Sequence, residues 1–121
     1  MESVTNLSKA YNLNLSARRN DTFTTTLLVK ESSVAVDLSE YTAAKMQLKE
    51  NENADAAVTF TNTGSTYNIN LSNLATGYVT VSASTLNIVS GSYLYDLELR
   101  NTTKTQTVVY GKFHVINDIT K

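Results

Sequence analysis

Several residue types are missing or scarce in this chain of 121 residues, and each absence excludes a class of structure or site. Cysteine is absent, so disulfides and thiolate metal sites are excluded, and stability must come from packing and backbone hydrogen bonds. Proline and tryptophan are also absent, and only four glycines occur. The missing cysteines leave the redox state of the compartment open.

An excess of charge of one sign and long apolar runs are lacking as well. The chain has 10 Lys and Arg against 11 Asp and Glu, a formal charge of -1, which gives no electrostatic case for nucleic acid or an anionic membrane as partner. No run of about 18 apolar residues could span a bilayer, and the first residues include an early glutamate and no apolar signal-peptide core. We therefore expect a soluble protein that no cleaved signal exports.

Apolar residues recur at every second position along most of the chain, a pattern typical of half-buried strands. Residues 92–100 show it most clearly. One face there carries Tyr93, Tyr95, Leu97 and Leu99, and the other carries Leu94, Asp96, Glu98 and Arg100. Similar alternation is found in residues 22–30, 42–49 and 105–116. The only helix that we expect is one turn within residues 84–91, between Ser84 and Gly91.

About eight short strands in one small domain predict an all-β fold, an antiparallel two-sheet immunoglobulin-like β-sandwich. We expect an N-terminal arm over residues 1–11 and a single sandwich domain over residues 12–121. The turn at 62–65 predicts a hairpin of residues 57–61 with 66–71, and the turn at 101–104 predicts one of residues 92–100 with 105–116. The true immunoglobulin signature is missing, because it requires Cys and Trp.

No set of residues has the pattern of a catalytic or cofactor-binding site. The single histidine, His114, lies on the polar face of a predicted strand and is expected to be solvated. Asp96 and Glu98 share one strand face, where they could bind a divalent cation or act as a carboxylate pair, or could instead pair with Arg100 or Lys112. We expect no enzyme activity, no cofactor and no metal.

Tyrosine is the most abundant aromatic residue, and its role is open at this point. Exposed tyrosines could form a platform on which sugars stack, or they could be core and rim residues with the hydroxyl at the surface. The seven are Tyr11, Tyr41, Tyr67, Tyr78, Tyr93, Tyr95 and Tyr110. Exposed, coplanar Tyr67, Tyr78 or Tyr110 beside a shallow groove would favour sugar binding.

Four segments, in order and spanning nearly the whole chain, resemble a known family. They read ARRNDTFTTTLLV, VDLSEYTAAKMQLKE, GYVTVSASTLNIVSGSYLYDLELR and VVYGKFHVINDITK. The family is the amino-terminal β-sandwich module of the upper baseplate protein of lactococcal-type tailed phages, also found in other phage tail and virion proteins.

The resemblance rests on short motifs at matching places. An Arg-Gly-Asp-Thr motif is matched by residues 19–22, Asp-Leu-Thr-Gly-Tyr by 37–41, and Tyr-x-Tyr-Asp-Leu-Glu by 93–98. The closing Gly-x-Phe-x-Val and Asp-x-Thr are matched by Gly111, Phe113, Val115, Asp118 and Thr120. Two family glycines are replaced, by Asn20 and Glu40. Asn tolerates left-handed backbone angles, so its turn should survive, whereas Glu40 implies a different turn or some strain.

The resemblance implies a non-enzymatic bacteriophage virion protein, made in the host cytoplasm and attached to a tail, baseplate, neck or capsid component. Because the chain stops where the resemblance stops, we expect an adaptor, decoration or joining module, present as a homo-oligomer or in multiple copies. Candidate interface residues are Tyr11, Arg18, Arg19, Asp96 and Glu98, and the arm is either frayed or ordered against a neighbour. The alternative is a small carbohydrate-binding sandwich that recognises bacterial surface glycans.

Overall fold

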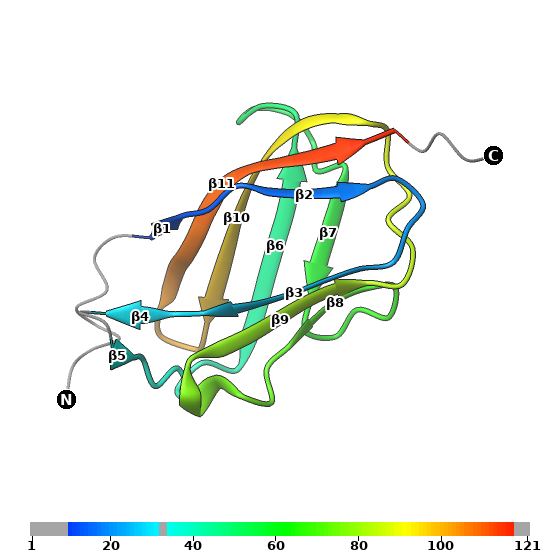
Figure 1. Cartoon of the computed structure of the whole chain (residues 1–121). Coiled ribbons are helices and arrows are strands. Elements are labelled where there is room, and N and C mark those ends of the chain that lie inside the picture. Colours follow the sequence, from blue (N-terminus) through cyan, green and yellow to red (C-terminus); the bar gives the residue numbers. More distant parts are fainter. Residues whose placement is uncertain (1–9, 32–33, 118–121) are drawn as a thin grey trace.

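The computed structural model describes residues 10–31 and 34–117, which form eleven short strands and one 3-10 turn (Figure 1). The elements, in chain order, are β1 (Tyr11–Asn12), β2 (Leu15–Arg18), β3 (Phe23–Leu28), β4 (Lys30–Glu31), β5 (Val34–Ala35), β6 (Ala43–Lys49), β7 (Val58–Thr61), β8 (Tyr67–Asn70), η1 (Leu74–Thr76), β9 (Tyr78–Ala83), β10 (Gly91–Arg100) and β11 (Thr105–Ile116). The predicted all-β class is confirmed. Of the arm expected over residues 1–11, residues 1–9 lie outside the described residues, and Tyr11 belongs to β1.

Nine strands join one curved, nearly closed sheet, in the order β1-β11-β10-β6-β7-β8-β9-β3, with β2 also paired to β11. In Figure 1, β3, β8 and β9 cross over the layer that contains β11, β10, β6 and β7. Both β1 and β2 run parallel to β11, and β7 meets β8 through one parallel pair, Thr61 with Asn68. The sheet is therefore mixed and continuous, which differs from the predicted pair of purely antiparallel sheets.

The core lies between the two layers and follows the alternation expected from the sequence. All four inward positions of β10, Tyr93, Tyr95, Leu97 and Leu99, are buried. The ring of Phe113 on β11 packs edge-on against Phe23 of β3, with centroids 5.2 Å apart, and against Tyr95 at 6.3 Å. Among the described residues no polar or charged residue is fully buried, so apolar burial stabilises this core.

Two local predictions are wrong. Residues 84–91 contain no helical turn, because the backbone of Leu86 pairs with Asn20 and Asp21 while its side chain fills the core. The only 3-10 turn among the described residues is η1, which ends at Gly77 in a left-handed conformation (φ 85°). The predicted hairpin of residues 57–61 with 66–71 does not form either, because β8 leaves β7 to pair with β9 in the other layer.

The strand faces hold with two exceptions. Thr42, expected to point inward, is exposed and precedes β6, whereas Ala44, Met46 and Leu48 are buried as expected. In β11 a bulge between Thr107 and Val109 buries Val108, which was expected on the polar face. The predicted turn at 101–104 is confirmed: β10 and β11 form a long antiparallel pair around it.

The two turns at which the resembled phage module has glycine behave differently. Asn20 has a φ of 69° and is the only described non-glycine residue with a positive φ. The turn at Glu40 is therefore of another type: Leu38 accepts a hydrogen bond from the N–H of Tyr41, and Asp37 Oδ1 accepts one from the N–H of Ser39. Asn20 thus supplies the left-handed angle that a glycine would otherwise provide.

Candidate functional site

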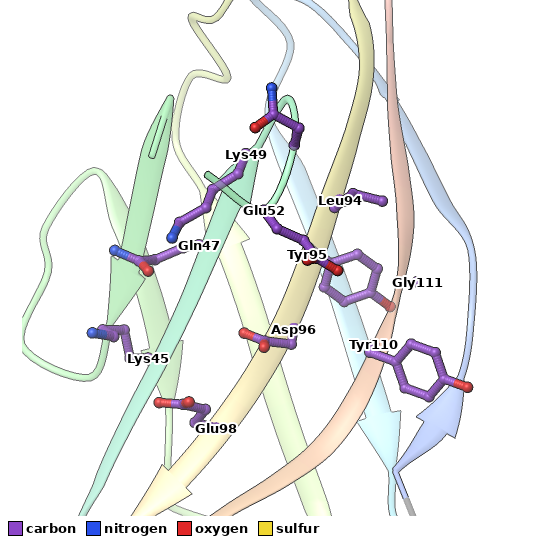
Figure 2. Close-up of a pocket in the computed structure, with 11 residues that line it drawn as sticks. Lys45, Gln47, Lys49, Glu52, Leu94, Tyr95, Asp96, Glu98, Tyr110 and Gly111 are labelled. Atoms are coloured by element: carbon purple, nitrogen blue, oxygen red, sulfur yellow. The ribbon is translucent and has the colours of Figure 1, made fainter. Parts of the chain in front are cut away.

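A groove lies on the outer face of β6, β10 and β11, opposite the core (Figure 2). We call it the β10 groove. It encloses about 470 Å³. Its lining consists of Lys45, Gln47, Lys49, Asn51, Glu52, Leu94, Tyr95, Asp96, Glu98, Tyr110 and Gly111.

The strand register explains why these side chains meet. Outward positions of the three strands stand side by side, since neighbours on a sheet share a face. Asp96 lies opposite Gln47 on β6 and opposite Tyr110 on β11. Glu98 lies opposite Lys45. In Figure 2 the carboxylates of Asp96 and Glu98 point toward the row of β6 side chains, so the groove has a β6 wall of Lys and Gln and a β10 wall of carboxylates.

The charges of the groove are only partly paired. Glu98 Oε1 lies 3.2 Å from Arg100 Nη2, so the alternative in which a carboxylate pairs with Arg100 is confirmed for Glu98. Both side chains are partly exposed, and such a pair contributes less than about 1 kcal/mol. Lys45 and Lys49 form no ion pair with a described residue, so the β6 wall keeps two available ammonium groups.

Asp96 lies in the groove with a shifted pKa. Partial burial raises the pKa of Asp96, the nearby charge of Glu98 raises it further, and Lys49 and Lys45 lower it. Its carboxylate accepts no hydrogen bond from a described residue. A ligand that donates hydrogen bonds to Asp96 would therefore supply partners that the described chain does not.

Only one of the three candidate tyrosines borders the groove. Tyr110 is 44% exposed and lies opposite Asp96. Tyr78 is similarly exposed but begins β9 in the other layer. Tyr67 packs edge-on against Phe60, and its hydroxyl accepts the N–H of Asn87. The three tyrosines therefore form no shared platform.

The residues predicted as an interface fall into separate places. Asp96 and Glu98 lie together in the β10 groove. Arg18 ends β2 opposite Ile116, six residues along β11 from Tyr110, which corresponds to about 20 Å. Arg19 follows it in the turn, and its N–H donates to Ile116. Tyr11 begins β1, opposite Val109.

The groove residues that sequence reasoning missed are Gln47, Asn51, Glu52 and Tyr110 as neighbours of Asp96. They come from different strands or from the loop after β6, and no sequence spacing links them. The register of β10 against β6 and β11 brings Gln47 and Tyr110 to Asp96, whereas Asn51 and Glu52 join the groove from the loop after β6.

Other possible chemistry is limited in the described part of the chain. It contains no group of three or more His, Asp or Glu side chains arranged to hold a metal ion. His114 is exposed and faces Ser92 and Ser16 on its neighbouring strands. Within residues 10–31 and 34–117, no helix has the length and apolarity needed to cross a membrane.

No protein-family model matches the chain, and no curated protein matches it.

Proposed function

We propose that this chain is a non-enzymatic structural protein of a bacteriophage particle, a small immunoglobulin-like β-sandwich that joins or decorates a tail, baseplate, neck or capsid component. The sequence motifs of the phage baseplate module support this proposal. So does an electrically balanced chain whose described residues form an apolar core and a nearly closed sheet with an unpaired edge at β3.

The observation that carries the proposal is the unpaired edge of β3. This strand ends the path of the main sheet and pairs only with β9 among the described residues. Residues 22–29, TFTTTLLV, contain no charge and no proline, the two devices that usually protect an exposed strand edge. Strand β2 pairs with β11 and not with this edge. A strand from a neighbouring virion protein could pair here through main-chain hydrogen bonds.

The test is the mass of complexes formed with candidate virion neighbours, measured by light scattering after size-exclusion chromatography. We expect a discrete complex with one of them, or a defined oligomer. Thr24→Lys places a charge on the exposed face of β3 and should weaken that complex at least tenfold. Ser92→Lys, an equally exposed position on the central strand β10, is the control and should leave it intact.

Two outcomes separate the parts of the proposal. A wild-type monomer that binds no virion component overturns the structural role. A complex that forms equally well with Thr24→Lys overturns the β3 edge as its contact.

Glycan binding is the second candidate, and one observation favours it. Tyr110 is an exposed aromatic residue beside a polar groove, which is the setting in which sugars commonly bind. The platform of three tyrosines is not the basis for it, because Tyr67 and Tyr78 lie elsewhere. The arrangement at the groove is instead a single aromatic residue, Tyr110, surrounded by hydrogen-bonding groups.

A further inference from the structure

We infer that the β10 groove binds a short neutral saccharide, with one sugar ring stacked on Tyr110 and its hydroxyl groups hydrogen-bonded to Asp96 and Gln47. This inference rests on the glycan-binding candidate and is independent of the assembly role of the β3 edge. The site is defined by three strands whose register is fixed by backbone pairing.

The groove has an exposed apolar surface on which a sugar ring can pack. A sugar ring has a face of C–H groups that packs on an aromatic ring, while its hydroxyls point outward and need polar partners. Tyr110 and Leu94 are 44% and 39% exposed, and both border the groove. They are the two large apolar side chains of the groove that reach solvent, and an aromatic residue with a polar tip suits such a half-wet position.

Several hydrogen-bonding groups of the groove lie next to Tyr110. Asp96, directly opposite, can accept several hydrogen bonds and receives none from a described residue. Gln47, on the other side of Asp96, donates one hydrogen bond to Thr59 at 3.4 Å and keeps its amide oxygen as an acceptor. Lys45 and Lys49 add donors along the β6 wall. Sugar hydroxyl groups both donate and accept hydrogen bonds. They can therefore donate to the carboxylates of the β10 wall and accept from the lysines of the β6 wall.

The charged side chains of the groove, which carry both signs, favour a neutral ligand. The groove carries two lysines on one wall and Asp96, Glu98 and Glu52 among the remaining lining residues. An anionic ligand would meet the carboxylates at close range, and a cation would meet the lysines, so each pays a repulsive cost. Uncharged hydroxyls avoid both. A volume of about 470 Å³ lies within the range of small-molecule sites, about 300 to 1,000 Å³.

The carboxylate of Asp96 is available to a ligand in the folded chain. The Asp96 side chain is exposed, so a ligand can reach the carboxylate from solvent, and desolvation together with the charge of Glu98 raises its pKa. Hydroxyls that donate to the carboxylate of Asp96 would form charge-assisted hydrogen bonds, which are stronger than neutral ones.

The experiment is a titration of ¹⁵N-labelled protein with maltotetraose, cellotetraose and chitotetraose, followed by backbone amide NMR shifts. We expect saturable shifts with at least one of them, confined to the neighbourhood of Leu94, Asp96 and Tyr110. Tyr110→Ala should weaken binding at least tenfold, and Tyr110→Phe should retain it because stacking needs only the ring. Asp96→Asn should weaken it several-fold.

The matched control is Tyr78→Ala, which removes a similarly exposed tyrosine from the other layer and should leave affinity unchanged. The inference is overturned if none of the three sugars gives saturable shifts, if the shifts map away from the groove, or if Tyr110→Ala binds as tightly as wild type. Tighter binding of an oligogalacturonate than of every neutral sugar overturns the neutral class. Because the NMR titration uses no partner protein, its failure leaves the mass test of the β3 edge unaffected.

Discussion

The hydroxyl of Tyr95 donates a hydrogen bond of 2.6 Å to the carbonyl oxygen of Leu13, a residue 82 positions earlier in the chain. The same segment is held at two more points. The N–H of Leu13 donates to the carbonyl of Tyr110, and Asn14 Oδ1 accepts the N–H of Lys112. The short link between β1 and β2 is therefore fastened to β10 and β11 by both side-chain and backbone hydrogen bonds.

Tyr95→Phe removes the side-chain part of this fastening and leaves the Leu13 carbonyl without its donor. We expect a loss of about 1 to 2 kcal/mol in the free energy of unfolding, and of about 3 to 5 kcal/mol for Tyr95→Ala, which also empties part of the core. Urea unfolding measures both. Tyr110→Phe is the control, because its exposed hydroxyl bonds to no described residue. A loss below about 1 kcal/mol for Tyr95→Ala would mean that this side chain is not in the core.

Alkaline pH should weaken the fold partly through the same tyrosine. Burial raises the pKa of Tyr95 to about 12, whereas an unfolded tyrosine titrates near 10. Above about pH 10 the unfolded chain loses this proton and the folded chain keeps it, so stability is full below about 10 and falls as pH rises through about 12. Tyr95→Phe should show a shallower decline in unfolding free energy. Burial also raises the pKa of Tyr41 and Tyr93, so some decline remains; equal slopes would contradict the prediction.

Gly111 permits the close crossing of the β1–β2 link over β11. A Cβ at this position would lie 2.3 Å from the carbonyl oxygen of Leu13, so Gly111→Ala must displace the link. We expect a loss of about 2 kcal/mol or more in urea unfolding. Gly91→Ala is a close control, because its φ of 153° resembles the 158° of Gly111 while its Cβ would meet no atom within 4 Å. Similar losses in the two variants would assign the effect to backbone conformation alone.

Phe113 joins the two layers through its ring contacts with Phe23 and Tyr95. Phe113→Ala should cost about 3 to 5 kcal/mol, because a fully buried aromatic side chain leaves a cavity. His114→Ala, at the next and outward position, should change stability by less than about 0.5 kcal/mol. Thermal unfolding of the two variants distinguishes the faces of β11, and a reversed order would mean that the faces are exchanged.

The left-handed conformation of Asn20 gives a test of the turn before β3. Asn20→Gly should be neutral or slightly stabilising, since glycine adopts a φ of 69° without steric cost. Asn20→Ala should lose about 1 kcal/mol in the free energy of unfolding. The turn is anchored by the N–H of Asn20 donating to Leu86 at 2.6 Å, so both variants should keep the fold. Identical stability of the two variants would argue against a left-handed residue here.

The parts of the fold that depend on neighbours in sequence were predictable. The inward faces of β3, β6 and β10 follow from a period of two, and the β10–β11 hairpin follows from a short polar turn. The absence of an antiparallel β7–β8 hairpin was not, because a turn only one residue longer, residues 62–66, carries the chain from one layer into the other. The expected helical turn at Ser84 does not form, because the backbone of Leu86 pairs with Asn20 and Asp21 instead.

The candidate site shows the same division. Asp96 and Glu98 were identified from alternation within β10, but their neighbours Gln47 and Tyr110 depend on the pairing of three strands that are distant in sequence. The alternation also misplaced Val108, because a one-residue bulge shifts the faces of β11 without any local marker. Sequence periodicity therefore located β10, but not the groove residues on the strands that pair with it.

The parallel pairing of β2 with β11 has a consequence for how the chain acquires its structure. Asn14 and Lys112 are hydrogen-bonded although they lie 98 positions apart in the sequence, so β2 cannot take its place in the sheet until residues 105–116 have been made. Closing so long a loop is entropically slow. Until β11 has been made, the edges of β10 and β2 that pair with β11 remain open to other strands. Nascent chains that share one messenger RNA would then be exposed to each other for the longest time.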